Sequence, residues 1–485
     1  SLTIQTLNSQ GNIVLTSSGN DPVAMQVDTL NITGGKFAVP DENKTYETGQ
    51  VYTVINFNTL LNFNNFETET MLSDFIAVTP IQESNRIDMG VNFLRISEQN
   101  VSFSAQEQQI VRLLDQMYFD KGQSDFKRFY YYSRDGLKEQ INVLRSKAQP
   151  VPAEHLPLTK TMASQVYTHL FANTMMRDAA SVRQPYVPMQ QSRGRYYRGR
   201  SGGNAPLNQK VWGQLLGGWT KENGNSALKQ DDINTKTIGA MFGYDYEFSE
   251  QLLIGLTVGA ASSSLKQGRS EVYIKDYRAG FYTGSRFGKL TLNTILMGGL
   301  QTYKSTRRLQ LTGLNVKNIG NFNGYSAEFD INVGYDLMRM PYRDYSFYVR
   351  PYLAASVNYL HQDAYEEKGS AFMALGISES SETSVSVSPG MTLGYTFSEM
   401  VLTADIGYSR IVSGDSVQNT AYFLADTTKT TFSSLSSDTD KDFFNAGLGI
   451  KKNLNQNLQV HFWAGTRLSK KTESLNLSAT LNYKF

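Results

Sequence analysis

The length of 485 residues predicts two or three domains, and 46 Lys+Arg against 44 Asp+Glu leave a formal charge of +2. This balance argues against a nucleic-acid-binding protein that depends on overall charge. The lack of cysteine excludes a disulfide framework, a thiolate zinc site and a cysteine nucleophile. No apolar run reaches about 18 residues, which excludes a membrane-spanning helix but not alternating membrane-spanning β-strands. Because Ser1 lies in mid-pattern, we expect a processed or truncated chain.

Residues 1–103 are predicted to form β-strands joined by turns. The region is rich in Asn, Thr, Val and Gly, and it contains short apolar runs such as Val51–Phe57. Glycines at 34, 35 and 49 lie between such runs, as is typical of turns. No clean repeat period is found, so the sequence is compatible with a parallel β-helix without requiring one.

The next segment changes to a helical pattern. Ser104 and Glu107 have the spacing of a capping box that opens an amphipathic helix, and Gly122 is predicted to end this helix. A second helix is expected within 126–144, with an interruption near Gly136.

The helical segment, 104–184, closes with a third predicted helix, Thr159–Val182. This stretch has no Gly or Pro and many small residues. At about 1.5 Å per residue it would be about 36 Å long, which is enough to cross a bilayer. It is therefore the candidate for a helix that lies inside a pore.

A basic linker is predicted at 185–209. Its part at 190–204 combines Arg with Gly and Tyr, a composition that can bind RNA or a phosphate surface. A flexible linker is the favoured interpretation, because no comparable platform for stacking bases is found elsewhere in the chain.

From residue 210 to residue 485 the side chains alternate with a period of two. In 325–337 every odd-numbered residue is apolar, and the even-numbered residues include three acids. Such runs are longer than the about 5–6 residues of ordinary globular strands, and aromatic residues lie near their ends. We predict twelve strands near 210–222, 235–249, 251–265, 271–287, 289–305, 322–339, 345–361, 382–397, 400–412, 440–453, 457–468 and 473–485.

The connections between these strands predict their topology. Short connections such as Ser249–Gln251 and Phe287–Lys289 alternate with longer ones such as Lys304–Asn321 and Ser413–Thr439, and Lys266–Ser270 is a short exception. An even number of strands with alternating short and long turns is typical of an outer-membrane barrel whose short turns are periplasmic. The predicted fold is therefore all-β with a helical segment: a twelve-stranded antiparallel transmembrane β-barrel preceded by a β-helix-like region and α-helices.

The inward face of this predicted barrel carries charge of both signs. Mixed charges inside about 12 strands imply a lumen that contains water and can hold a further segment. Simple solvation with mutual ion pairing is the alternative to a lumen that holds the helix Thr159–Val182. The residues assigned to the lumen are Asp245, Glu247, Asp276, Arg278, Glu328, Asp330, Asp336, Arg350, Asp405, Lys451, Arg467 and Lys484.

The sequence resembles the C-terminal part of a type Va autotransporter of Gram-negative bacteria. The stretch Val211–Trp219 (VWGQLLGGW) resembles the first barrel strand of that family, and Gly239–Tyr246, Leu252–Gly259 and Ala279–Gly288 resemble the next three. Upstream, Gly49–Ile55 resembles the end of a passenger β-helix. The resemblance implies an outer-membrane translocator at 210–485 that exports its own N-terminal passenger, of which 1–103 is the tail, to the cell surface.

The resemblance also implies roles for single residues. Tyr483 and Phe485 would belong to the signal that the barrel-assembly machinery reads. From their charge, Lys160 and Arg177 in the candidate pore helix are expected to pair with lumen acids such as Asp245, Glu328, Asp330 or Asp405. Some family members cut this helix at an Asn inside the lumen, but Asn173 with several nearby acids does not identify such a site.

The sequence and the resemblance together give the expected partners and the alternative functions. Expected partners are outer-membrane lipid, the assembly machinery, periplasmic chaperones and the passenger, with no nucleic acid, no cofactor, no metal and a monomeric state. A passive porin-like channel is one alternative. An outer-membrane hydrolase that uses His361 and Asp363 in a loop is another, although that loop offers no second acid–base set.

Overall fold

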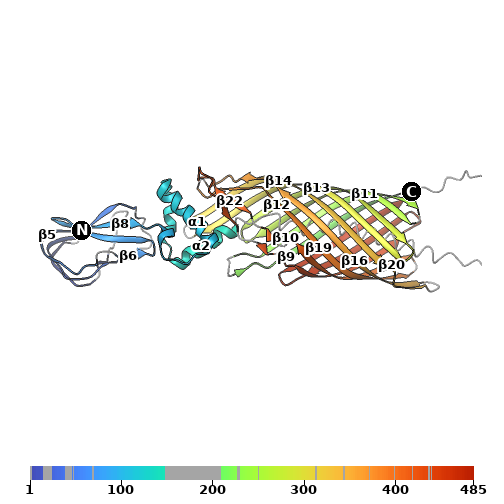
Figure 1. Cartoon of the computed structure of the whole chain (residues 1–485), viewed down its shortest axis with the longest axis horizontal. Helices are drawn as coiled ribbons and strands as arrows, with labels where there is room; N and C mark the ends of the chain where they lie inside the picture. Colours follow the sequence, from blue (N-terminus) through green and yellow to red (C-terminus); the bar gives the residue numbers. More distant parts are fainter. Residues whose placement is uncertain are drawn as a thin grey trace, which may run out of the picture. The chain divides into compact units, whose positions relative to one another are not determined.

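The computed structural model describes two compact units (Figure 1). The first comprises 1–144 with 425–432, and the second comprises 145–424 with 433–485. The structure describes residues 3–147 and 209–485 except for 12, 15–24, 39–45, 47, 68–69, 227–229, 250, 312–313, 342–344, 371, 398, 415, 418, 435–436 and 439.

Parallel strands form the start of the first unit. β1 (Thr3–Ser9), β3 (Met25–Ile32) and β5 (Val51–Phe63) pair in parallel in that order, and β2 (Ile13–Val14) pairs in parallel with β4 (Phe37–Ala38). Two parallel ladders formed by successive turns of the chain are the arrangement of a β-helix. These ladders are compatible with the predicted β-helix-like region.

A ladder of asparagine side chains ties successive turns of this β-helix together. The Asn31 amide donates to Asn8 Oδ1 at 2.8 Å, and the Asn62 amide donates to Asn31 Oδ1 at 2.9 Å. The three residues are partners in the strand register. Antiparallel strands follow the stack: β8 (Arg86–Phe93) pairs with β5, and β7 (Ile76–Gln82) lies between β8 and β6 (Thr70–Ser73).

Short helices complete the first unit. The predicted capping box is present at α1 (Ala105–Asp115), where Ser104 Oγ accepts from the Glu107 N–H at 3.2 Å and the Glu107 carboxylate accepts from the Ser104 N–H at 2.8 Å. The other helices are η1 (Ile96–Glu98), the π-helix η2 (Gln116–Asp120), the 3₁₀ helix η3 (Ser124–Tyr131) and α2 (Arg134–Lys147).

The predicted interruption near Gly136 lies slightly earlier in the chain, at 132–133. α2 continues through Gly136, and the chain breaks before it, between η3 and α2. The physical reason is an N-terminal cap: Ser133 Oγ accepts from the Gly136 N–H at 3.2 Å, so the helix starts at this serine.

One buried carboxylate connects the helices of the first unit. Asp115 is 2% exposed and accepts from the N–H groups of Ile96 at 3.0 Å and Ser97 at 2.8 Å. The Tyr130 hydroxyl donates to it at 2.7 Å. Burial raises the pKa of the Tyr130 phenol, and Asp115 acts in the same direction, so the phenol keeps the proton that this hydrogen bond needs.

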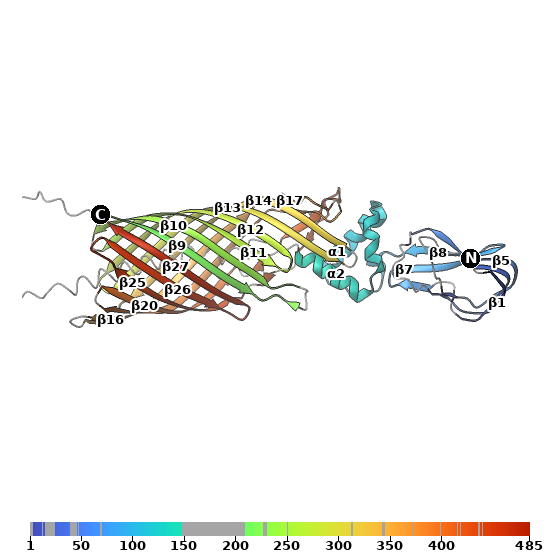
Figure 2. The same ribbon diagram turned by 180° about the vertical axis from the view of Figure 1, so that it is seen from behind.

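The second unit contains the predicted closed barrel (Figure 2). Its last strand pairs antiparallel with its first from Thr472↔Glu222 to Lys484↔Lys210, and this pairing leaves no free edge at the seam. The twelve long strands of the described residues are β9 (Gln209–Glu222), β10 (Ile233–Ser249), β11 (Leu252–Gln267), β12 (Ser270–Phe287), β13 (Leu290–Leu311), β14 (Leu314–Tyr335), β16 (Tyr345–Gln362), β19 (Ser380–Phe397), β20 (Met400–Ser413), β25 (Asp442–Asn453), β26 (Leu458–Leu468) and β27 (Thr472–Lys484).

The predicted loop Lys304–Asn321 is wrong. β13 and β14 stay paired throughout this stretch, up to Leu311↔Leu314. Each of the two strands has 22 residues, whereas about 9–11 residues span a membrane. The two strands are therefore longer than a membrane-spanning strand needs to be, and we call their paired ends the β13–β14 extension (residues 305–311 and 314–320).

Two further predicted loops contain short strands. Residues 363–379 hold β17 (Tyr365–Glu366) and β18 (Leu375–Ile377), and 414–441 hold β21 (Ser416–Val417), β22 (Thr420–Phe423), β23 (Phe432–Ser433) and β24 (Ser437–Asp438). β17, β18 and β22 pair in that order. At the opposite end of the barrel, β15 (Met338–Pro341) extends the short turn before β16. None of the helices in the described ranges is long and apolar enough to cross a membrane.

Candidate functional site in the barrel lumen

The two faces of the barrel wall differ in the way that the alternation predicts. On β12, Tyr273, Tyr277 and Phe281 are exposed on one face. Asp276 and Arg278, each 4% exposed, lie on the other face. In a closed barrel the buried face is the inner one, so polar and charged side chains line the lumen.

A charged cluster lies where β12, β13 and β14 meet. Arg278 Nε donates to Asp276 at 2.9 Å, and Arg278 Nη1 lies 3.4 Å from the Glu328 carboxylate. The Gln301 amide donates to Asp276 at 3.0 Å and to Ser326 Oγ at 2.8 Å. These contacts are fully buried, so the predicted lumen charges are joined to one another. Sequence reasoning did not assign Gln301 or Ser326 to the site.

Ion pairs also lie near the short-turn end of the barrel. Asp336, in the turn after β14, accepts from Arg350 at 2.6 Å and from Arg286 at 2.9 Å. Lys210 on β9 donates to Glu247 on β10 at 2.7 Å. Each pair joins residues from different parts of the wall. These contacts therefore stabilise the barrel and also place charged groups on its inner face.

The other predicted lumen residues lie on the inner face in different surroundings. Asp405 accepts from the Tyr352 hydroxyl at 3.0 Å and from Thr392 Oγ1 at 2.8 Å. The Arg467 guanidinium lies 3.7 Å from the centroid of the Phe443 ring. Asp330 and Lys451 are buried, and Lys484 is half-buried at the strand end.

The inner face is not only polar, which the sequence pattern did not predict. Trp212 Nε1 donates to the Tyr282 hydroxyl at 2.7 Å, and Tyr282 donates to Asp245. These two rings belong to a buried cluster that fills part of the lumen. The cluster consists of Trp212, Leu216, Met241, Leu253, Tyr282, Ile295 and Met297.

Inward aromatic rings cover glycines on the neighbouring strand. Tyr282 is the register partner of Gly255, and a Cβ at Gly255 would lie 2.1 Å from the Tyr282 ring. Trp212 lies in the same way over Gly243, at 2.2 Å. The glycines therefore leave room for large rings inside the wall, an arrangement known to support glycine in strands.

The loop end of the lumen carries a folded cap. Tyr365 of β17 stacks on Phe322 of β14 at 4.0 Å, and Phe322 stacks on Tyr303 of β13 at 4.7 Å. Phe322 and Tyr303 lie on the inner face of their strands. The loop strands β17, β18 and β22, which we call the loop cap, therefore pack on the lumen side of the wall.

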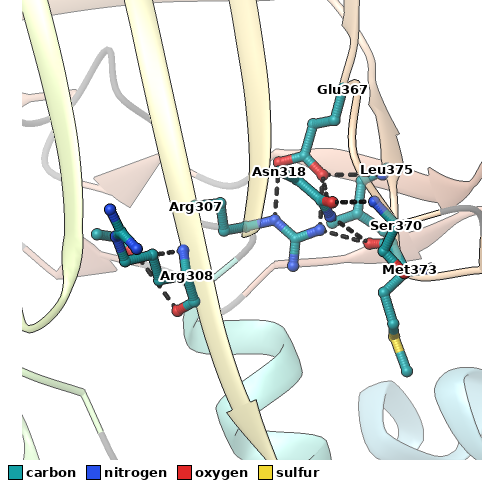
Figure 3. A network of polar contacts seen from close by, with 8 residues as sticks. Arg307, Arg308, Asn318, Glu367, Ser370, Met373 and Leu375 are labelled. Atoms are coloured by element: carbon teal, nitrogen blue, oxygen red, sulfur yellow. Dashed lines mark hydrogen bonds and ion pairs between the residues drawn. The ribbon is translucent and has the colours of Figure 1, made fainter. Parts of the chain in front are cut away.

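A buried ion pair fastens the loop cap to the β13–β14 extension (Figure 3). Arg307 donates to both oxygens of Glu367, at 2.7 and 2.6 Å, and to the Met373 carbonyl at 2.6 Å. Asn318 donates to Glu367 at 3.2 Å, and the Leu375 N–H donates to it at 2.9 Å. Burial raises the pKa of the neighbouring Tyr365 phenol, and Glu367 acts in the same direction.

The two residues of the hydrolase alternative lie close together at the loop end. His361 Nε2 is 3.4 Å from Asp363 Oδ1, and His361 Nδ1 is 2.7 Å from Ser381 Oγ. His361 stacks on Tyr325, one of the exposed rings, at 4.6 Å. The group lies on the outer wall of the barrel and not in the lumen, and Ser381 was not assigned from the sequence.

The remaining predicted residues are at the C-terminus and in the candidate pore helix. Tyr483 and Phe485 are 44% and 61% exposed, and their rings contact each other with centroids 5.3 Å apart. Lys160, Asn173 and Arg177 lie outside the described residues, as does the basic linker. Within the described ranges, no group of three or more His, Asp or Glu is placed to hold a metal ion.

The second unit thus combines a barrel lumen with a loop cap that is bonded to the wall at the loop end. The lumen is lined by polar side chains that bond to one another. An apolar cluster fills part of the lumen on the side of β9–β13. The loop cap lies at the loop end. Such a wall can hold an extended or helical segment by hydrogen bonds and charge pairing.

Part of the chain is similar to known proteins. Residues 211–465 match the family described as Autotransporter beta-domain. The translocator domain of the autotransporter NalP from Neisseria meningitidis is similar at 16% identity, over 67% of this chain and 99% of that one, with a TM-score of 0.47. The transport unit of AIDA-I from Escherichia coli is similar at 14% identity, over 60% and 94%, with a TM-score of 0.43. The beta domain of Bordetella BrkA is similar at 13% identity, over 57% and 100%, with a TM-score of 0.41. A comparison with curated proteins gives no significant match.

Proposed function

The chain belongs to the autotransporter β-domain family, and its barrel is an outer-membrane translocator for a passenger domain; from that premise we propose that it exports its own N-terminal part to the cell surface. The β-helix-like strands of the first unit are the tail of this passenger. The observation that carries the proposal is a family-matched, closed barrel with a polar lumen on the same chain as a β-helix end.

The proposal assigns orientation and partners. The short turns at one end of the barrel face the periplasm, and the loop cap faces the outside, in keeping with the usual asymmetry of outer-membrane barrels. The barrel acts as a monomer and is inserted by the assembly machinery with the help of periplasmic chaperones. Export uses no catalysis by the barrel, no cofactor and no nucleic acid.

Surface display is the direct test. An epitope inserted in the exposed β7–β8 turn at 83–85 is expected to bind antibody on intact cells. The same epitope inserted in the short turn after β12, at 288–289, is the matched control and is expected to bind only after the outer membrane is permeabilised. A reversed pattern, or labelling of neither site on intact cells, would contradict the proposed export.

Bilayer conductance separates a translocator from a porin-like channel. We propose that the predicted helix Thr159–Val182 lies in the lumen, where Lys160 and Arg177 pair with lumen acids such as Asp405. Removing residues 1–205 is then expected to raise the single-channel conductance to that of an open, ohmic pore, because about 12 strands leave room for water. Equal conductance of the two chains would show that no upstream segment occupies the lumen.

A further inference from the structure

A group of lysines lies on the outer wall of the barrel near its loop end. Lys236 on β10, Lys275 on β12 and Lys304 on β13 are all exposed. They alternate with the buried residues of the same strands, such as Asp276 and Tyr303, and therefore point away from the lumen. We call these three residues the outer lysine group.

The strand register brings the three lysines onto one patch. Lys236 pairs with Ser264, Ser264 with Tyr273, and Tyr273 with Lys304, so Lys236 and Lys304 lie in one row across four strands. At about 4.8 Å between strands this separation is roughly 14 Å. Lys275 is two residues from Tyr273 on the same strand, which makes it the diagonal neighbour of Lys304 at about 7–8 Å.

The patch has more positive than negative charge. Neighbouring lysines on the same face have acidic partners: Lys221 lies 3.5 Å from Asp232, and Lys266 lies 3.6 Å from Glu271. In the part of the chain that the structure describes, no ion pair is recorded for the outer lysine group. Like charges that share one face of a sheet repel one another, so a bound anion would stabilise this surface.

An apolar belt adjoins the lysines on the side of the short turns. Ile238 follows Lys236 by two residues and is 72% exposed, and Tyr277 follows Lys275 by two residues and is 53% exposed. Leu300, four residues before Lys304 on a strand of opposite direction, is 68% exposed. The side chains on the outer wall thus change from apolar to cationic within two to four residues. Such a change is typical of the boundary between acyl chains and headgroups.

On the other half of the barrel wall, an exposed arginine near the loop end has an acidic partner. There Arg410 on β20 is neutralised by Asp442 on β25, at 3.1 Å. Polar uncharged side chains such as Ser381 occupy the corresponding face of β19. The outer lysine group therefore makes β10–β13 a sector in which exposed lysines gather without an ion pair among the described residues.

We propose that the outer lysine group binds phosphate groups on the headgroups of outer-leaflet lipids. The lysines supply charge for the phosphates, and the adjacent apolar belt contacts the acyl chains of the same molecules. The inference rests on the proposed function only for the orientation of the barrel, with its loop end outward. It makes one sector of the wall a lipid-phosphate site, in contrast to uniform contact with lipid all around the barrel.

Lipid titration of the purified full chain in neutral detergent tests the proposal. The probes are bis-phosphorylated lipid A, its fully dephosphorylated form and inorganic phosphate, and the readout is native mass spectrometry of bound lipid. The variant Lys236→Gln/Lys275→Gln/Lys304→Gln is expected to bind the phosphorylated lipid roughly 100-fold more weakly, about five-fold for each lysine near an anionic headgroup. Dephosphorylated lipid is expected to bind equally to both proteins.

Control variants separate charge at this sector from charge in general. Lys289→Gln/Lys452→Gln removes two exposed lysines at the short-turn end and is expected to bind like the unmodified chain. The triple Lys→Arg variant keeps the charge and is expected to retain binding. The single variants, each expected to show about a five-fold loss, serve if the triple glutamine variant does not migrate as a folded barrel.

Several results would overturn the proposal. Equal binding by the triple glutamine variant and the unmodified chain would do so, as would an equal loss in the short-turn control. Complete displacement of lipid by millimolar inorganic phosphate would show a site for the free ion instead of a lipid site. Surface display of the epitope at 83–85 is read in the same variants, so failed export with intact lipid binding would count against the proposed function and not against this inference.

Discussion

Deletion of Tyr483–Phe485 is expected to abolish insertion of the barrel into the outer membrane while leaving the chain able to fold in detergent micelles. The two aromatic side chains are exposed at the end of the closing strand, where another protein can bind them. The register pairs of β27 with β9 from Thr472 to Asn482 do not involve the deleted residues. Heat-modifiable migration, measured on outer-membrane fractions and on refolded protein, checks both parts.

A matched variant separates recognition from pairing. Asn482→Ala changes an inward residue of the same strand end and keeps both aromatic side chains, so we expect it to insert normally. Normal insertion of the deleted chain would refute a role for these residues as an assembly signal. Failure of the deleted chain to refold in detergent would show that the last residues are needed for closure itself, through bonds such as that from the Asn457 amide to the Lys484 carbonyl at 2.7 Å.

Periodicity was enough to predict the barrel because each long strand separates lipid from lumen. In β12 the alternation of Tyr273, Tyr277 and Phe281 with Asp276 and Arg278 is visible in the sequence and matches the exposed and buried sides of the strand. The alternation was therefore sufficient to predict the number of strands and the closed topology, and both predictions are confirmed. Segments that do not lie between lipid and lumen show no alternation of apolar and polar residues. Those are the segments for which the sequence pattern predicted the wrong structure.

The β13–β14 extension is the clearest of these cases. Its outer face carries polar residues such as Arg308 and Lys317 in place of apolar ones, so the alternation seemed to end at Lys304. Its inner face buries Arg307 and Asn318. The partner that makes these polar residues suitable for burial is Glu367, which lies 60 residues after Arg307. Sequence spacing alone does not reveal a pairing of that kind.

The apolar cluster inside the lumen was missed for a related reason. Tyr282 needs a glycine opposite it, and Gly255 becomes its neighbour only through the register of β11 with β12. If the inner face is expected to be polar, the inward positions of Ile295 and Met297 have no explanation. Both side chains are buried in this cluster. Matching glycines with inward aromatic residues across predicted registers is the signal that could have found it.

The second prediction concerns the loop cap. Glu367→Leu is expected to destabilise the cap by about 3–5 kcal/mol, because Arg307 is buried and would lose its only carboxylate contacts among the described residues. The barrel ladders do not include Glu367, so heat-modifiable migration should be unchanged. Limited proteolysis of the loops at 363–379 and 414–441 is expected to accelerate by about two to four orders of magnitude if it tracks the open population.

Neighbouring residues on the two faces of β13 give the control. Arg308 follows Arg307 but lies on the exposed outer face, where its backbone N–H and carbonyl bond to the Ser270 hydroxyl, so Arg308→Met should change the proteolysis rate little (Figure 3). The double variant Arg307→Met/Glu367→Leu removes both buried charges together and is expected to regain most of the lost protection. If Glu367→Leu instead behaves like Arg308→Met, the ion pair does not hold the cap. The stack of Tyr365 on Phe322 would then be the contact that keeps the loops over the lumen.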